Sequence, residues 1–574
     1  MRYRFVDTLN IGIENLDLEA LQFNSNAYSV LLYQHLGDFL PTPTKFGNSN
    51  NVESHRKFEA FIRLAKVENV SLAITPEYSC PWSVIRDILS NEEIQPSNGK
   101  LYAIGCESIT RDELNTLEND FSNNERIIFF DKSVLNNNGN FFDPLCYIFR
   151  NQNRLYLIIQ FKTHHMGVWT NRIESDHYKD GREIYILRNN PDSVYLFSLI
   201  CSEAMNFEIN PQFLNDVNNQ WIGKPYIILN PQLNPGPNSH DFRLFYEKIL
   251  VDFEQKDLIC LNWANGSTVN GSPFIHFGRS GLFIKTHQID FSSDVNFSAN
   301  HLKGVYYLNN KRDIHSFYLC SYKPVFRIRC QKPITSGLPG VQLRKSEPIV
   351  EKVFDWVNNA YKQIITIDDS LNAFLDSHNC PSLYLRRADV SCVDKERLII
   401  LSSGLVKSSK RIHWHFVDNL FSYELDDTWA VKRATFLEDN EGDRYRIWYL
   451  ESLSYLNVLL IKNEAYWPPI LNLFRGNPID EVKFMDGQST SRYLYNFFSG
   501  ENRATVICLN YERRLLAPKV LNETRNIFQE QSRNRVVVWY KTSLIGDNFD
   551  SITNEADLPI TDLPVYDANS INRE

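Results

Sequence analysis

Three side chains that could cooperate in acyl chemistry, Glu77, Lys162 and Cys201, occur in similar sequence contexts. Each stands just past a short apolar run, and the runs are Val70–Ile74, Leu155–Phe161 and Val194–Ile200. Short apolar runs of this kind predict buried strands. A lone cysteine here would be interpreted as a core thiol, because free cysteines are commonly buried. A carboxylate, an amine and a thiol at the ends of three buried strands instead predict a catalytic constellation.

The three residue types supply what nucleophilic catalysis requires. Cysteine attacks as a thiolate, and a neighbouring cation lowers the pKa of a thiol, so Lys162 is expected to assist Cys201. A carboxylate can accept the thiol proton and later activate water, which is the role expected of Glu77. The ammonium of Lys162 can also stabilise the oxyanion of a tetrahedral intermediate.

The order and context of these residues resemble the Glu-Lys-Cys triad of the nitrilase (carbon-nitrogen hydrolase) superfamily. Further segments are similar to motifs of that family, and they are Val30–Gln34, Pro76-Glu77-Tyr78, Lys162-Thr163-His164, Glu174-Ser175 with Gly181, Leu199–Glu203, Leu258–Asn262 and Gly278–Ile284. The resemblance covers residues 25–330 and implies an α-β-β-α sandwich. Predicted helices at Ser54–Val67 and Phe242–Phe253 alternate with strands, which independently favours an α/β domain.

The resemblance also implies roles for residues around the triad. The carboxylate of Glu174 would support Lys162. Ser202, in a supporting position, stands where the family usually has an aromatic residue that shapes the pocket. His164 is interpreted as a supporting, structural hydrogen-bonding residue rather than an acid or base. The candidates to line a substrate pocket are Trp169, Asn262 and Trp263.

The activity that the resemblance implies is hydrolysis of a small-molecule amide or carbamoyl compound, with a nitrile less favoured, through a thioester on Cys201. Neither a metal nor a cofactor is expected, because His164, His165 and Cys201 lack the spacing of metal ligands. Acyl transfer to an amine would use the same residues. A different hypothesis makes the domain a regulatory or scaffold module, since superfamily members occur in multi-protein systems, including bacterial anti-phage defence. Members commonly self-associate, so a homo-oligomer is expected.

Composition predicts a folded protein with more than one domain. The 574 residues exceed one ordinary core, and the 43% hydrophobic and 13% aromatic content favours globular structure. A net charge of −9 with mixed signs disfavours a dedicated nucleic-acid binder. No apolar run approaches a membrane span, no signal peptide opens the chain, and ten scattered cysteines lack a Cys-x-x-Cys pair. These features predict a cytoplasmic protein with reduced thiols.

Dense Pro and Gly between residues 333 and 340 mark a domain boundary. The predicted division is 1–24 as an N-terminal arm, 25–330 as the nitrilase-like domain, 331–345 as a linker, 346–545 as an α/β or α+β C-terminal domain of unknown role, and 546–574 as a flexible acidic tail. In the C-terminal domain, helices are predicted at Glu347–Phe374 and Val520–Gln531, and strands at Arg397–Leu401, His413–Val417, Trp448–Ile461, Thr505–Asn510 and Val536–Tyr540.

Two short segments of the C-terminal domain leave alternatives open. Leu401–Leu405 invites comparison with the ATP-binding loop of glutamine-dependent NAD synthetases, but the second Gly and the Asp of that loop are absent, which favours a turn. Lys407–His415 mixes basic and aromatic residues and is interpreted as a solvated turn before a strand, with a nucleic-acid patch as the alternative. A protein partner is expected to bind through this domain.

Overall fold

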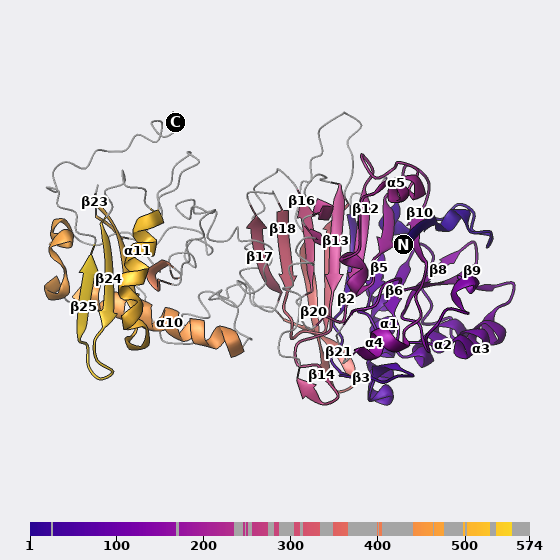
Figure 1. Cartoon of the computed structure of the whole chain (residues 1–574), viewed down its shortest axis with the longest axis horizontal. Helices are drawn as coiled ribbons and strands as arrows, with labels where there is room; N and C mark the ends of the chain where they lie inside the picture. The colour runs from indigo at the N-terminus through magenta and orange to yellow at the C-terminus, as the bar shows by residue number, and fades with distance from the viewer. Residues whose placement is uncertain are drawn as a thin grey trace.

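Two large β-sheets covered by helices form the greater part of the protein (Figure 1). The computed structural model describes residues 1–23, 27–167, 172–234, 245–246, 248–250, 255–273, 280–285, 303–309, 314–332, 348–365, 399, 401–404, 440–462, 464–475, 497–499, 502–527 and 535–553. The statements below concern these residues.

The first sheet has nine strands in the order β21-β20-β19-β2-β5-β6-β8-β9-β7. Their bounds are β2 Ala27–Tyr33, β5 Leu72–Ile74, β6 Leu101–Gly105, β7 Arg126–Phe130, β8 Pro144–Asn151, β9 Arg154–Phe161, β19 Val325–Gln331, β20 Ile349–Val357 and β21 Ala360–Ile364. β5 lies parallel to both of its neighbours, β2 and β6, and all its residues are buried. The strands predicted before Glu77 and Lys162 are therefore confirmed as β5 and β9.

The second sheet has eight strands in the order β1-β10-β11-β12-β13-β16-β18-β17. Their bounds are β1 Arg2–Phe5, β10 Glu183–Arg188, β11 Tyr195–Ser198, β12 Tyr226–Pro231, β13 Lys256–Leu261, β16 Gly281–Lys285, β17 Gly304–Asn309 and β18 Ile314–Leu319. β11 lies between β10, which is antiparallel to it, and β12, which is parallel to it. The strand predicted before Cys201 is confirmed as β11, and all four of its residues are buried.

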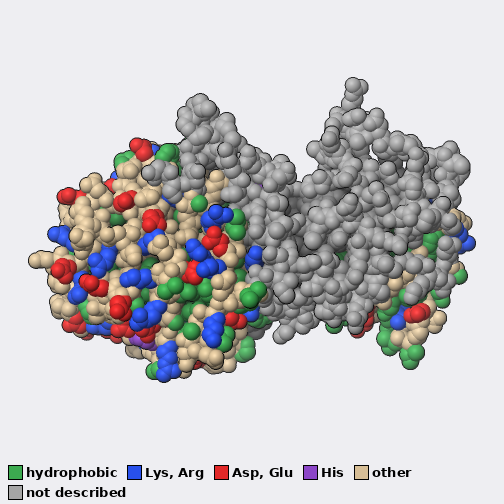
Figure 2. Space-filling model, turned by 180° about the vertical axis from the view of Figure 1, so that it is seen from behind, with side chains coloured by type: hydrophobic (Ala, Val, Ile, Leu, Met, Phe, Trp, Pro, Cys, Tyr) green, Lys and Arg blue, Asp and Glu red, His purple; other side chains and the backbone are tan. Residues whose placement is uncertain are grey.

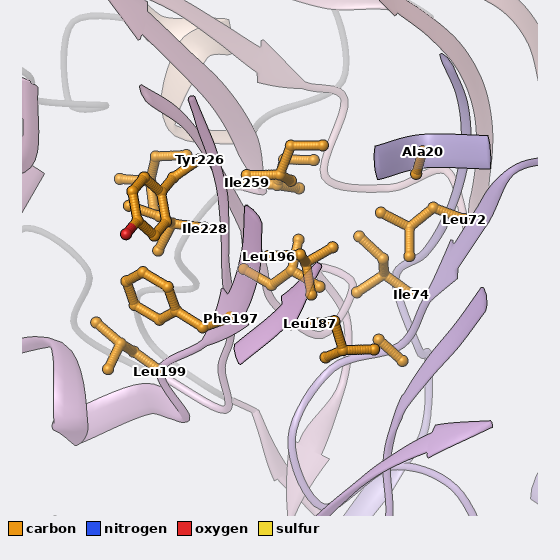
Figure 3. Close-up of a cluster of buried hydrophobic side chains, with 14 of the residues drawn as sticks. Ala20, Leu72, Ile74, Leu187, Leu196, Phe197, Leu199, Tyr226, Ile228 and Ile259 are labelled. Atoms are coloured by element: carbon orange, nitrogen blue, oxygen red, sulfur yellow. The ribbon is translucent and has the colours of Figure 1, made fainter. Parts of the chain in front are cut away.

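The two sheets share one hydrophobic core. Leu72 and Ile74 of the first sheet and Leu196 of the second belong to the same cluster of buried side chains (Figure 3). The next residue of β11, Phe197, lies on the other side of the strand, where it packs against Trp221. This alternation follows from the two-residue period of a strand, and each fully buried Leu or Ile contributes about 1.5–3 kcal/mol to folding.

Helices cover the outer faces of both sheets. α1 (Asn51–Val67), α2 (Trp82–Ser90) and α3 (Arg111–Phe121) bury their apolar faces in a cluster that also contains residues of β5, β6, β8 and β9. α5 (Pro211–Asp216) and helical residues of the segment 245–250 join the cluster that contains the second sheet. The predicted helix Ser54–Val67 is confirmed as α1, and the described part of Phe242–Phe253 is helical. The α-β-β-α layering predicted from the sequence is therefore confirmed.

The sequence also dictates where these helices begin. The side chain of Asn50 accepts a hydrogen bond from the backbone N–H of Glu53, which caps α1. Thr110 and Glu113 form a reciprocal capping box at the start of α3. A small four-stranded sheet completes this part of the protein, and its strands in order are β15 Ser272–Pro273, β14 Thr268–Val269, β3 Asp38–Pro41 and β4 Phe46–Asn48.

The N-terminal residues are an integral part of the second sheet. β1 pairs with β10 in parallel, and Tyr3, Phe5 and Val6 are buried in the core that the two sheets share. The prediction of a separate arm over residues 1–24 is therefore wrong for residues 1–23, which the structure describes. The apolar side chains of these residues are buried in an edge strand and in the turns that follow it, rather than on one face of a separate segment.

The predicted helix Glu347–Phe374 is wrong where the structure describes it, because β20 and β21 extend the first sheet there. The pairing of β20 with β19 shifts register between Arg327 and Ile328, which leaves Glu351 without an opposite residue. Buried side chains therefore fall at Val350, Val353 and Phe354, a spacing of three and four residues that imitates a helix. The first sheet thus continues past the boundary predicted at residues 331–345.

The hairpin that joins β20 and β21 has a recognisable turn. Asn358 and Asn359 both adopt a positive φ, 52° and 60°, as the two central residues of a type I′ turn require. Asn tolerates this left-handed conformation better than other non-glycine residues do, so the Asn-Asn pair is a hairpin signal that the helix interpretation passed over.

The C-terminal unit has its own four-stranded sheet and its own cluster of buried side chains. In sheet order its strands are β22 Phe497–Ser499, β23 Asn502–Leu509, β24 Val536–Lys541 and β25 Phe549–Thr553, and its helices are α10 Asn440–Asn457 and α11 Ala517–Ile527. The predicted strands at Thr505–Asn510 and Val536–Tyr540 are confirmed as β23 and β24, and the described part of the predicted helix Val520–Gln531 is confirmed as α11.

Other predictions for the C-terminal unit are wrong. Trp448–Ile461 is helical in α10 and the π-helical turn Val458–Lys462, and Ile399 and Leu401 are also helical. β25 lies inside the segment predicted to be a flexible tail. His413–Val417 and residues 554–574 of the predicted tail lie outside the described residues. Apolar runs alone do not separate a strand from a buried helix, which explains the error at Trp448–Ile461.

The described surface carries charges of both signs. On the face in Figure 2, Lys and Arg side chains are interspersed with Asp and Glu side chains over the described part. Within the described part of the chain, no helix combines the length and the apolar character that crossing a membrane would demand.

The burial of β20 leads to a prediction of stability. Val353→Ala should lower the free energy of unfolding by about 2 kcal/mol, because it leaves a cavity beside β19. Val357 lies on the same strand but is 41% exposed, so Val357→Ala should change stability by less than about 0.5 kcal/mol. Hydrogen exchange followed by mass spectrometry should show faster exchange in β19 and β2 only for Val353→Ala. Equal effects of the two variants would contradict the pairing described here.

Candidate active site

The structure brings Glu77, Lys162 and Cys201 together in a fully buried cluster. Glu77 follows β5 and Lys162 follows β9 in the first sheet, whereas Cys201 follows β11 in the second. The side chains of the three residues are at most 2% exposed. The thiol of Cys201 and the carboxylate of Glu77 therefore come from different sheets, and the packing of the sheets sets the distance between them.

The ammonium of Lys162 holds the cluster together. Its Nζ atom lies 2.7 Å from Glu77 Oε1, 2.7 Å from Glu174 Oε1 and 3.5 Å from Asp143 Oδ2. Burial by itself would lower the pKa of Lys162, but the attraction of Glu174, Glu77 and Asp143 outweighs it and raises that pKa well above its usual value. Lys162 is therefore a permanent cation, and the predicted support from Glu174 is a direct ion pair.

Glu174 lies in the short helix α4 (Ile173–His177), where other donors fix it. The hydroxyl of Tyr78 donates to Glu174 Oε1 at 3.0 Å, and the N–H of Met166 donates to Glu174 Oε2 at 3.1 Å. Tyr78 has a positive φ of 55°, which is rare for an aromatic residue and turns its side chain toward Glu174. Both oxygens of Glu174 are thus engaged, which fixes its contact with Lys162.

Glu77 is held at both ends. Its Oε2 atom accepts the N–H of Leu233 at 2.7 Å, and its backbone carbonyl accepts the indole N–H of Trp263 at 2.8 Å. Asn262 exchanges two hydrogen bonds with the backbone of Asn234, the residue after Leu233. In these contacts Asn262 and Trp263 position the carboxylate. Their predicted place in the pocket stays a prediction, and Trp169 lies outside the described residues.

Cys201 occupies a strained turn. It is the first residue of the 3₁₀ turn Cys201–Ala204 and has a positive φ of 41°, a conformation that residues other than glycine and asparagine adopt uncommonly. Its Sγ atom lies 4.0 Å from the carbonyl of Leu233. A sharp turn at the end of a strand fixes the direction in which the thiol points.

The environment favours the protonated thiol. Burial and then the charge of Glu77 raise the pKa of Cys201 well above its ordinary value, and the opposing effect of Lys162 is smaller. Lys162 lowers this pKa, as the sequence led us to expect, but burial and the charge of Glu77 outweigh that effect, so the net shift is upward. A thiol in this state reacts only when a base removes its proton, which makes the adjacent carboxylate necessary.

Glu203, which lies in the predicted motif Leu199–Glu203 but was given no role of its own, ties the loop after β9 to the turn of Cys201. Its carboxylate accepts the N–H of Thr163 at 2.6 Å and the N–H of Ile200 at 2.6 Å, and so links the residue after Lys162 to the residue before Cys201. Burial raises the pKa of Glu203 from 4.5 to about 7. A carboxylate two positions after a cysteine at the end of an apolar run was the sequence signal that could have indicated this role.

Ser202 and His164 form a second link between these loops. The hydroxyl of Ser202 donates to the carbonyl of His164 at 2.6 Å, and His164 Nδ1 is 2.9 Å from the hydroxyl of Thr163. The supporting roles of both residues stay predictions. Asp143 is the other residue that the sequence interpretation missed, and its carboxyl belongs to the same buried cluster as Glu77 and Glu174.

Several solved structures are similar to this chain. No protein-family model and no curated protein matches the chain. Similar solved structures include a double mutant of the amidase from Nesterenkonia sp. AN1 in complex with acrylamide, at 12% identity over 45% of this chain and 83% of that chain, with a TM-score of 0.26. Nit3 from Saccharomyces cerevisiae, described as a member of branch 10 of the nitrilase superfamily, matches at 15% identity over 46% of this chain and 84% of its own, with a TM-score of 0.27.

The NitFhit protein of C. elegans matches at 10% identity over 45% of this chain and 56% of its own, with a TM-score of 0.28. The family named for Nit3 is the one that the sequence motifs resemble.

The ion cluster predicts a pH-dependent cost of removing Lys162. Lys162→Met should lower the free energy of unfolding by about 3–5 kcal/mol at pH 8, because it leaves buried carboxylates without their cation. At pH 5 the loss should be smaller, since carboxylates deprived of a cation are more easily protonated. Urea unfolding at both pH values measures the difference. Lys132→Met is the control, because Lys132 is exposed and its pair with Glu118 should contribute at most about 1 kcal/mol. A Lys162→Met effect as small as the control would refute the cluster.

The raised pKa of Glu203 gives a second pH dependence. Because the folded state binds this proton more tightly than the unfolded state, Glu203 stabilises the fold fully below pH 4.5 and loses that contribution as the pH rises to about 7. The stability of Glu203→Gln relative to wild type should therefore rise across this window, by on the order of 3 kcal/mol. Urea unfolding between pH 4 and 8 tests this. Glu208→Gln, at an exposed carboxylate, should show no such trend, and a flat difference for Glu203→Gln would contradict the assignment.

Proposed function

We propose that the chain is a cysteine-dependent hydrolase of non-peptide carbon-nitrogen bonds, acting on a small-molecule amide or carbamoyl compound through a thioester on Cys201. One observation carries the proposal. The buried thiol of Cys201, on a turn with positive φ, lies beside the carboxylate of Glu77, and the Nζ atom of the buried Lys162 holds that carboxylate at 2.7 Å from Oε1. Burying this many ionisable groups together is costly for a structural core, whereas catalytic sites commonly use such clusters to shift pKa values.

In the acylation step, Glu77 accepts the proton of Cys201 as the sulfur attacks the carbonyl carbon. A carbon–sulfur bond forms, and the electron pair of the carbonyl moves to its oxygen. The resulting oxyanion is stabilised by Lys162 and by the backbone N–H that follows Cys201. When the oxyanion collapses, the carbon–nitrogen bond breaks, the nitrogen takes the proton from Glu77, and ammonia or an amine leaves. The raised pKa of Cys201 supports this order, because the thiol needs a base.

In the deacylation step, Glu77 accepts a proton from water, whose oxygen attacks the thioester carbon. The carbon–sulfur bond breaks, the sulfur regains its proton from Glu77, and a carboxylic or carbamic acid is released. The same residues would support transfer of the acyl group to an amine in place of water. The fixed contacts of Glu77 with Lys162 and Leu233 support a single base that serves both steps.

A substrate panel tests the proposal. Ammonia release from free amides, carbamoyl compounds and nitriles should be detectable with the wild type, and Cys201→Ala should reduce it by on the order of 10⁴-fold or more, because the nucleophile is lost. The mass of the product separates hydrolysis from acyl transfer, since added hydroxylamine would be incorporated as a hydroxamate.

The matched control is Cys330→Ala. Cys330 is also a buried cysteine, but it lies on β19 rather than in the cluster. Its substitution should leave turnover within a fewfold of wild type. Unaltered turnover in Cys201→Ala would sink the mechanism, and equal losses in both variants would point to a loss of folding rather than of a nucleophile.

A further inference from the structure

Asp143 lies in the catalytic cluster at a position fixed by the backbone. It directly precedes β8, and its carbonyl accepts the N–H of Lys162 at 2.9 Å. β8 and β9 pair in antiparallel register, with Pro144 opposite Phe161, so the residue before one strand faces the residue after the other. The side chain of Asp143 is fully buried. It cannot turn to solvent without a change in the pairing of these two strands.

The carboxyl group of Asp143 has no hydrogen-bond donor among the described residues. Neither of its oxygens has a hydrogen-bond partner in the part of the chain that the structure describes. Lys162 Nζ is 3.5 Å away, and its closer contacts, at 2.7 Å, go to Glu77 and Glu174. Other buried carboxylates of the site each accept two or more hydrogen bonds. An ionised carboxylate without donors in a buried site is strongly disfavoured.

What Asp143 does face is another carboxylate. Oxygens of Glu77, Asp143 and Glu174 lie within 4.8 Å of one another, around one ammonium. Three ionised carboxylates and one cation would leave two uncompensated negative charges in a buried volume. Like charges this close do not all ionise, and a shared proton resolves the conflict, as in carboxylate dyads. A protonated Asp143 would gain a donor and direct it at an acceptor.

We propose that Asp143 is a positioning residue that holds a proton as a neutral acid and donates its O–H to the carboxylate of Glu77. The hydrogen bond orients the carboxylate of Glu77 toward Cys201. The proton on Asp143 also removes one of the two negative charges that the ammonium of Lys162 would leave uncompensated. The protonation rests on the structure of the cluster alone, whereas the effect on turnover rests on the function proposed above.

Electrostatics agrees with this assignment. Burial raises the pKa of Asp143 well above its ordinary value, and the charge of Glu77 raises it further, while Lys162 opposes both. Glu174 adds to the rise. The other ionisable groups that act on or respond to Asp143 are the hydroxyls of Tyr78 and Tyr178, both of which are neutral because burial raises their pKa values well above the ordinary range.

The protonation can be tested without any substrate. An infrared spectrum of the wild type at pH 8, with the aspartates labelled with ¹³C at the side-chain carboxyl, should contain the carbonyl stretch of a protonated carboxylic acid, shifted by the label. The band should be absent from Asp143→Asn. Glu203 does not interfere, because it is largely ionised at this pH and carries no label. If the wild type lacks the band, the proposal is overturned whatever the activity of the protein.

The kinetic test compares two substitutions in the full chain. Asp143→Asn keeps a neutral donor, so kcat/KM should stay within about tenfold of wild type. Asp143→Ala removes the donor, so kcat/KM should fall by about 10- to 100-fold. The acid limb of its pH profile should also move to higher pH, because a carboxylate that loses a hydrogen-bond donor is easier to protonate. Circular dichroism and thermal unfolding establish that each variant is folded.

The direction in which the acid limb of the Asp143→Ala pH profile moves distinguishes a protonated Asp143 from an ionised one. If Asp143 were ionised, Asp143→Ala would remove a negative charge near Glu77 and would move the acid limb to lower pH. That shift, or a loss in Asp143→Asn as large as in Asp143→Ala, would overturn the proposal. If no substrate is turned over by the wild type, the function proposed above fails, and the infrared band still decides the protonation of Asp143.

Discussion

The structure of the site depends on one buried charge, the ammonium of Lys162. A cation out of water needs anionic partners, and its three partners come from a loop after β5, the start of β8 and the helix α4. The backbone packs tightly to allow this. A Cβ atom on Gly181 would lie 2.2 Å from the carbonyl of Phe161, and one on Gly105 would lie 2.1 Å from that of Pro76. Glycine at these two positions lets the chain pass directly behind Lys162 and Glu77.

The second constraint is that the site straddles two sheets. Glu77 and Lys162 follow strands of the nine-stranded sheet, and Cys201 follows a strand of the eight-stranded sheet. Hydrogen bonds cross the junction at several points, from Thr163 to Glu203, from Ser202 to His164 and from Leu233 to Glu77. A shared hydrophobic core brings the sheets near each other, but only directional bonds of this kind fix the side chains within the tolerance that catalysis requires.

Sequence patterns predicted the parts of this arrangement that local apolar runs encode. The strands that precede Glu77, Lys162 and Cys201 are buried over most of their length, so their runs are apolar and their ends are easy to locate. Asp143 and Glu203 were missed because their importance comes from which strand ends meet in space. β20 was misread as a helix because a bulge at Glu351 changed a two-residue period into spacings of three and four. In each case the outcome depends on how strands pair in the folded protein, and the sequence of a single strand does not reveal that pairing.

The division of the site between two sheets also affects how its geometry can be lost. A conventional active site on one rigid element is lost when that element unfolds. Here a shift of one sheet across the other would separate the thiol of Cys201 from the carboxylate of Glu77 even if every strand kept its hydrogen bonds. Such a species would look folded to far-ultraviolet circular dichroism. The geometry of the cluster therefore depends on the alignment of the two layers as well as on the integrity of each strand.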